Sequence, residues 1–248
     1  MAAITDGGAE QMSQWNKVDG VTTEAYGRRV GRLHVDNAAA IASRAFQDLA
    51  LVVGSAVAIM MLLLTPAHAV EPFDRATTPS QSSGLTMLWH DLQTEVAKDE
   101  VEITHCRMDS KCSAAAQRLI AIIDEARRYS GRRMIGHLNR GINGAIRSTR
   151  AIAPWLPPLA ALDQPGDCKS YAIVKYLALG ELGIAADDRR LVLLRGASRP
   201  NERHLVVLVR DDDRWIILDN QTLTLVDSVA ARQYEPLNEF DANGVRDF

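Results

Sequence analysis

Apolar side chains recur at helical spacing between about residues 114 and 147. In 114–128 the apolar positions lie three or four residues apart with charged residues between them, which predicts an amphipathic helix. In 134–147, Leu138, Ile142 and Ile146 are spaced by four and predict a second helix. Four prolines, at positions 154, 157, 158 and 165, then predict a loop, because proline removes a backbone N–H and ends regular structure.

The pattern changes its period after this proline loop. Residues 170–181 have the length and the Ala and Leu content of a helix, and Asp167 precedes them as a capping residue. Short runs rich in Val, Ile and Leu follow at 191–194, 204–210 and 214–218, with polar turns between them, and predict an antiparallel meander. Helices come first and strands later, which predicts an α+β domain rather than alternating units.

A long apolar segment, Leu49–Leu64, interrupts the N-terminal part of the chain. It is shorter than the roughly 20 residues of a transmembrane helix, and Ala67-His68-Ala69 after it has the small-x-small pattern of a signal-peptidase site. Because residues 1–48 precede it, we expect either a cleaved signal with translation starting downstream, for example at Val30, or a single-pass anchor. The C-terminal part is then periplasmic or secreted, or anchored to the inner membrane facing the periplasm.

The chain divides into three parts on these patterns. With 248 residues, of which 47% are hydrophobic, it can form one well-buried domain and an extension. Residues 1–69 are the extension with the signal or anchor, and 70–84 are rich in Pro, Ser and Thr, which predicts a disordered linker. The folded domain is expected at 85–248.

Charge and cysteine content narrow the possible functions. The 28 basic and 31 acidic side chains give a net charge of −3 and are spread along the chain without a basic stripe, so nucleic acid is not an expected partner. The 3 cysteines are an odd number, so at least one thiol stays unpaired within the chain.

Cys106 and Cys112 lie close together in the sequence and are expected to form a disulfide in an exported protein. The alternative is a metal site that also uses His105, although three ligands so close together without a fourth nearby suit zinc poorly. In the first case Cys168 is the free thiol.

Cys168 lies at the predicted start of a helix, where free backbone N–H groups and the helix dipole stabilise a thiolate. His204 opens one predicted strand and Asp219 closes the next, so a hairpin brings both to one end of the sheet. A thiol nucleophile needs an imidazole within hydrogen-bond reach and a carboxylate that orients the imidazole. We therefore predict a triad of Cys168, His204 and Asp219, with Asp167 and Asn220 as possible supporting residues and no metal ligands.

The sequence resembles the bacterial transglutaminase-like cysteine proteinases over about residues 85–240. The motifs that carry the resemblance are Trp155-Leu156-Pro157-Pro158, Gly166-Asp167-Cys168-Lys169-Ser170-Tyr171-Ala172 with Lys175-Tyr176, His204-Leu205-Val206-Val207 and Leu218-Asp219-Asn220. Asn139 and Asn143 also resemble the family's helix before the proline loop. The resemblance implies a papain-like, transglutaminase-like α+β fold, in which N-terminal helices carry the nucleophile at a helix start and pack on a small antiparallel sheet. It also implies a thiol mechanism.

The best-known branch of that family, the LapG-type periplasmic proteases, departs from this sequence beside the cysteine. The resemblance to this branch implies cleavage of large surface adhesins with calcium required, and acids on both sides of the cysteine are associated with the calcium. Here Asp167 is kept, but Lys169 and Ser170 follow the cysteine. Calcium binds several oxygen ligands and an ammonium group repels it. We therefore expect no cofactor and no requirement for calcium.

These observations predict an exported cysteine protease that hydrolyses a peptide bond in a protein of the cell envelope. The same triad also suits an acyl transferase or a peptidoglycan amidase, because the acceptor of the acyl group decides the product. A catalytically silent periplasmic binding module is the alternative of a different class.

Overall fold

The protein is described by a computed structural model that covers residues 71–109, 111–149, 151–196 and 199–248. The apolar segment 49–64 and the cleavage pattern at 67–69 lie outside these residues. Within the described ranges, no helix is both long and apolar enough to cross a membrane.

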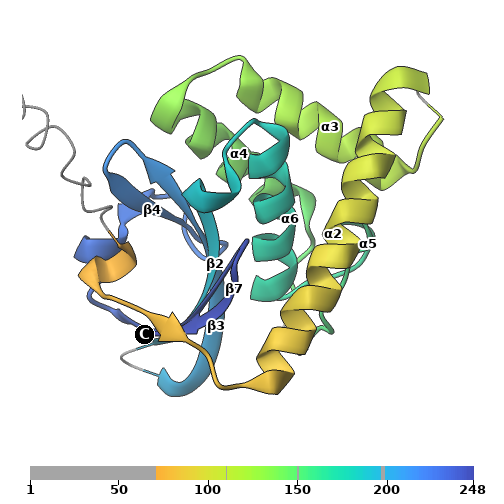
Figure 1. Cartoon of the computed structure of the whole chain (residues 1–248). Coiled ribbons are helices and arrows are strands. Elements are labelled where there is room, and N and C mark those ends of the chain that lie inside the picture. The colour runs from red at the N-terminus through yellow and green to blue at the C-terminus, as the bar shows by residue number, and fades with distance from the viewer. Residues whose placement is uncertain (1–70, 110, 150, 197–198) are drawn as a thin grey trace, which may run out of the picture. The chain divides into compact units, whose positions relative to one another are not determined.

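Helices cover one face of an antiparallel sheet (Figure 1). The α-helices are α2 (Ser83–Asp109), α3 (Ala114–Arg127), α4 (Gly131–Ala145), α5 (Pro158–Asp163) and α6 (Cys168–Glu181). The strands are β1 (Thr78–Pro79), β2 (Arg189–Gly196), β3 (Arg199–Asp211), β4 (Arg214–Leu218), β5 (Val226–Asp227), β6 (Tyr234–Asp241) and β7 (Gly244–Asp247). Short 3-10 helices are η1 (Pro72–Asp74), η2 (Ala186–Asp188) and η3 (Ser228–Ala230).

In the part of the chain that the structure describes, the sheet has seven strands in the order β1-β7-β6-β2-β3-β4-β5, and all neighbours are antiparallel. The predicted α+β class and the three predicted strands are confirmed, but the sheet is larger than expected. The proline loop is also more regular than predicted, because Pro158 is the first residue of α5, a position where its missing N–H costs no helical hydrogen bond.

The sheet separates two apolar clusters. Alternate residues of β3 point to opposite faces: Leu205 and Val207 belong to the main core under the helices, whereas Val206 and Leu208 belong to a smaller cluster on the other face. Phe73 of η1 packs on that smaller cluster. Both faces of β3 are therefore buried, which explains its continuous apolar run in the sequence.

Helix α6 lies at the centre of the domain, between the sheet and α2 (Figure 1). All residues from Ser170 to Leu179 are buried. Asp167 is its N-cap, as predicted, and its Oδ1 accepts the N–H of Lys169 at 3.0 Å. Burial on every side fixes α6 rigidly, so the residue at its start, Cys168, has a defined position.

Residues 71–84 differ from the predicted disordered linker. Thr78 of β1 pairs with Asp247 of β7, and the guanidinium of Arg246 donates hydrogen bonds to the carbonyl and hydroxyl oxygens of Thr77 at 2.8 and 2.7 Å. Glu71 forms an ion pair with Arg190 at 3.0 Å. The segment has no hydrophobic periodicity of its own, and its order comes from contacts with residues more than 100 positions away.

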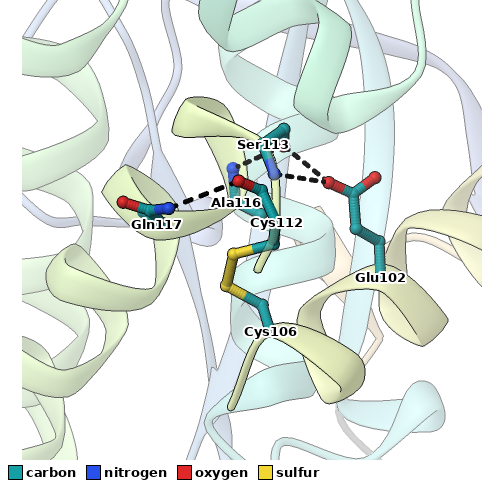
Figure 2. The surroundings of a disulfide bond; sticks show 6 residues. All are labelled: Glu102, Cys106, Cys112, Ser113, Ala116 and Gln117. Carbon is teal, nitrogen blue, oxygen red and sulfur yellow. Dashed lines mark hydrogen bonds between the residues drawn. A yellow bond between two sulfur atoms is a disulfide. The ribbon is translucent and has the colours of Figure 1, made fainter. Parts of the chain in front are cut away.

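A disulfide joins Cys106, near the end of α2, to Cys112, just before α3, as the sequence predicts (Figure 2). Next to it, Ser113 is the N-cap of α3 and its hydroxyl donates to Glu102 at 2.6 Å. Because the disulfide uses both thiols, the alternative metal site with His105 is wrong.

Candidate active site

Cys168 is the first residue of α6 and is half-buried. Its side chain is the one free thiol among the described residues. The start of a helix of this length stabilises negative charge through its dipole and its unpaired N–H groups. The backbone N–H of Leu205 also donates to the sulfur. The environment of Cys168 therefore favours a thiolate.

His204 lies within hydrogen-bond reach of both other members of the predicted triad. Its Nε2 donates to Oδ1 of Asp219 at 2.8 Å, and its ring also forms a hydrogen bond with the thiol of Cys168. The side-chain amide of Gln221 also contacts the ring, with its Nε2 3.5 Å from Nδ1 of His204. Cys168, His204 and Asp219 thus form one hydrogen-bonded series.

The position of His204 in its strand differs from the prediction. β3 begins at Arg199, so His204 lies inside the strand, where it pairs with Leu194 of β2. Asp219 directly follows the last residue of β4, as predicted. The β3–β4 hairpin that joins them turns at Asp212, which has a positive φ of 55°.

Asp219 is 1% exposed and has a complete set of hydrogen-bond donors. Besides His204, the backbone N–H of Gln221 donates to Oδ1 at 2.9 Å and the hydroxyl of Tyr234 donates to Oδ2 at 2.8 Å. The amide of Asn143, from α4, donates to the carbonyl oxygen of Asp219 at 2.9 Å. Sequence reasoning missed the contacts of Tyr234 and Gln221. No local pattern links Tyr234 to Asp219, whereas the Gln221 contact is an Asx turn, in which the aspartate side chain accepts the N–H two residues on.

The electrostatics of the series favour an ion pair. Burial opposes charge on all three groups, but the mutual hydrogen bonds and charges outweigh it. As a result the pKa of the Cys168 thiol is lowered, that of His204 is raised to about 9 and that of Asp219 is lowered to about 2. A thiolate beside an imidazolium is the reactive form of a cysteine nucleophile.

Cys168 and His204 open into a cleft with a volume of about 760 Å³. Its walls come from the segment before α5, the start of α6 and the adjacent ends of β2, β3 and β4. The lining residues are Ser148, Thr149, Ala151, Ile152, Asp167, Cys168, Lys169, Leu193, Glu202, Arg203, His204, Leu205, Asn220 and Gln221. Asn220 therefore lies in the cleft, whereas Asn139 is fully buried and is not among the lining residues.

The residues beside the cysteine do not suit calcium. Oδ2 of Asp167 accepts the N–H of Ala153 at 3.0 Å and also binds the ammonium group of Lys169, while Oδ1 accepts the N–H of Lys169. Within the described ranges, His, Cys, Asp and Glu form no group of three or more that could hold a metal ion. A carboxylate that already binds an ammonium group is a poor ligand for a divalent cation.

Comparison with known proteins gives one strong match. A family model described as bacterial transglutaminase-like cysteine proteinase BTLCP matches residues 102–239, a range that includes Cys168, His204 and Asp219. No curated protein matches the chain.

Solved structures give more distant matches. Calcium-bound LapG from Legionella pneumophila is 21% identical, with a TM-score of 0.48, over 60% of this chain and 86% of that chain. EGTA-treated LapG from the same organism is 21% identical, with a TM-score of 0.48, over 60% of this chain and 83% of that chain. Likeness at this level does not transfer residue roles or metal binding.

Proposed function

Because the chain belongs to the bacterial transglutaminase-like cysteine proteinase family and is a cysteine peptidase, we propose that it is exported and hydrolyses a peptide bond in a protein of the cell envelope. The proposed catalytic residues are Cys168, His204 and Asp219. The observation that carries this proposal is the hydrogen-bonded series from the Cys168 thiol through His204 to Asp219, in which Cys168 and His204 line an open cleft.

In the proposed reaction, the Cys168 thiolate attacks the carbonyl carbon of the substrate, and a carbon–sulfur bond forms. The His204 imidazolium gives its proton to the leaving nitrogen as the peptide bond breaks, which releases the amine product. Neutral His204 then takes a proton from water, the hydroxide oxygen attacks the acyl-enzyme and the thiolate leaves. Asp219 stays ionised throughout and orients the imidazole.

The negative charge on the substrate oxygen needs a donor near the sulfur. The N–H groups of Lys169 and Ser170 already donate to Asp167, at 3.0 Å each. Cys168 is the other residue in the first turn of α6. We propose that its backbone N–H group donates to the substrate oxyanion.

Export is supported by two features of the chain. The apolar segment 49–64, followed by Ala67-His68-Ala69, is typical of a signal peptide or of a membrane anchor. The Cys106–Cys112 disulfide suits an oxidising compartment such as the periplasm. The proposed partner is therefore a protein substrate in the cell envelope.

We also propose that hydrolysis does not require calcium, because the ammonium group of Lys169 holds the Asp167 carboxylate. Adding EGTA to the purified protein should leave the rate of hydrolysis unchanged. Loss of activity in EGTA that added calcium restores would contradict this.

The main experiment compares envelope proteins from cells that carry the wild-type protein with those from cells that carry Cys168→Ala. New protein N-termini that are present with the wild type and absent with the variant would identify the substrate and its cleavage site. Identical sets of N-termini in the two strains would overturn the proposal of a protein substrate in the envelope and favour the alternative of an amidase or an acyl transferase.

Labelling with iodoacetamide at pH 6 tests the nucleophile without a substrate. We expect Cys168 to react at least tenfold faster than an ordinary thiol, whose pKa of about 8.5 leaves it protonated at this pH. His204→Ala should remove the difference. A wild-type rate equal to that of an ordinary thiol would favour a silent binding module instead.

A further inference from the structure

Lys175 lies in the middle of α6 and is 0% exposed. Its Nζ has no hydrogen-bond partner among the described residues. A lysine that is removed from water without such a partner is strongly disfavoured, and an apolar residue would fill the same place at lower cost. The proposed triad reaction does not use this lysine, so its presence in the core needs an explanation.

The position of Lys175 relates it to the nucleophile. It follows Cys168 by seven residues, which is two turns, so both lie on the same side of α6. Side chains on a helix lean toward its N-terminus, so the long side chain of Lys175 extends back toward the level of Cys168. Lys175 is not among the lining residues of the cleft, so its side chain extends toward the level of the nucleophile within the buried interior.

Among the described residues, Asp219 is the charged group that interacts electrostatically with Lys175. Burial lowers the pKa of Lys175 to about 7, and the negative charge of Asp219 opposes this effect. Helix α4, which packs against α6, contributes the uncharged amides of Asn139 and Asn143 to the buried region, and each amide has an atom without a hydrogen-bond partner. The interior beside Asp219 is therefore polar, and Lys175 adds a second cationic group to the imidazole of His204.

The charges of the triad explain why a cation is useful there. A thiolate, an imidazolium and a carboxylate together carry one negative charge. In the weakly polar interior an unbalanced charge is much more costly than in water. A protonated Lys175 makes the total zero.

We propose that Lys175 is a positioning residue of this peptidase, whose buried ammonium group balances the charge of Asp219 and thereby favours the thiolate form of Cys168 near neutral pH. The kinetic part of this inference rests on the proposed function. The electrostatic coupling between Lys175 and Asp219 does not, and it is tested separately.

The coupling is tested by thermal unfolding of four proteins: wild type, Lys175→Met, Asp219→Asn and the double variant. Methionine keeps the length and removes the charge. In Asp219→Asn the lysine is left unbalanced, so Lys175→Met should raise Tm by about 2–4 °C more in this background than in the wild type. Equal changes of Tm in both backgrounds would overturn the proposed coupling.

Leu179→Met is the matched control, because Leu179 is equally buried in the same helix and carries no charge. Its effect on Tm should be the same with and without Asp219→Asn. A coupling as large as that of Lys175→Met would assign the result to packing and contradict the inference.

The kinetic part is tested by the pH dependence of iodoacetamide labelling of Cys168. Without the ammonium group, the rise in the labelling rate should move to higher pH by about one unit. Above pH 8 the rates of wild type and Lys175→Met should converge, because Lys175 is then largely neutral in the wild type and the variant carries no charge at this position. A lower rate at every pH with an unchanged midpoint indicates a purely structural role and would overturn the positioning role.

Failure of the proposed function and failure of the inference about Lys175 give different results. If wild-type Cys168 labels like an ordinary thiol, the proposed function fails, whatever the unfolding experiment shows. If wild-type Cys168 is activated and Lys175→Met leaves both the midpoint and the coupling unchanged, only the inference about Lys175 fails.

Discussion

Two pairs of aspartate and lysine flank the nucleophile, and they differ in their access to water. The outer pair, Asp167 and Lys169, borders the cleft and is in direct contact, with side chains 17% and 15% exposed. The inner pair, Asp219 and Lys175, is almost completely buried, and no hydrogen bond joins its two members. The same two residue types therefore occupy two different environments near Cys168.

The difference shows how the surroundings decide what a charge does. In the outer pair the ammonium and carboxylate groups neutralise each other locally, and water screens the remaining electrostatic effect of the pair on other groups. Asp167 also serves as the cap of α6. In the inner pair the charges are separated and unscreened, so Asp219 acts on His204 and Lys175 at the same time. We therefore expect the outer pair to affect structure and metal preference, and the inner pair to affect catalysis.

Removing the two carboxylates in turn should give the largest contrast. Asp219→Asn should lower kcat/KM by about 10⁴-fold, because an amide no longer stabilises the imidazolium or holds its tautomer. Asp167→Asn should lower it by less than about tenfold, since asparagine also caps helices well. The assay uses a peptide that spans the cleavage site found by the comparison of envelope N-termini. Similar losses in both variants would contradict the division of roles.

The pH dependence of hydrolysis should follow the interaction of Asp219 with His204. Because the pKa of His204 is raised to about 9, the imidazolium that protonates the leaving group persists up to that pH. We expect kcat/KM to fall about tenfold per pH unit above pH 9. Lys169→Met removes the outer ammonium group and should leave the fall of kcat/KM above pH 9 unchanged. A fall of kcat/KM that already begins near pH 6.5 in the wild type would show that Asp219 does not stabilise the imidazolium.

Tyr234→Phe should have a smaller effect on hydrolysis. It removes the hydrogen bond from the Tyr234 hydroxyl to Oδ2 of Asp219 and leaves the ring in place, and hydrogen bonds to charged groups contribute about 1.5–3 kcal/mol. We expect a loss of about tenfold in kcat/KM. Tyr129→Phe, away from the cleft, is the control and should be neutral. An unchanged rate in Tyr234→Phe would mean that His204 and Gln221 suffice to hold Asp219.

The smallest expected effect concerns metal preference in the outer pair. Lys169→Glu replaces the ammonium group with a second carboxylate next to Asp167, which gives calcium two acidic ligands. Calcium at tenfold its dissociation constant should then raise the Tm of the variant by about 3 °C, and EGTA should reverse this. The wild-type Tm should not respond. A calcium-dependent rise in the wild type would show that Lys169 does not exclude the ion.

Part of this arrangement is predictable from the sequence, because it depends on local patterns. The cap at Asp167, the helix after it and the hairpin between His204 and Asp219 all follow from short-range spacing. Helix α2 is harder to predict, because Asp99 interrupts its apolar stripe. That carboxylate accepts the N–H of Leu159 at the start of α5, at 2.8 Å, and this contact joins residues 60 positions apart.

Two features of the site itself were beyond prediction for the same reason. Tyr234 reaches Asp219 from β6, whose neighbours in the sheet are β7 and β2, so no hairpin pattern connects the two residues. Lys175 is in a helix that is buried on all sides, whereas a sequence pattern alone places lysine on a solvated face.

The short strand β1 has a consequence for solubility. An unpaired strand edge offers free N–H and C=O groups to other chains and promotes aggregation. Here the sheet ends on both sides in strands of two residues, Thr78–Pro79 and Val226–Asp227, and Pro79 cannot donate a hydrogen bond to an added strand. The segment that follows the apolar N-terminal part of the chain thus protects the edge of β7. A chain that loses residues 71–79 should keep its nucleophile and lose its resistance to aggregation.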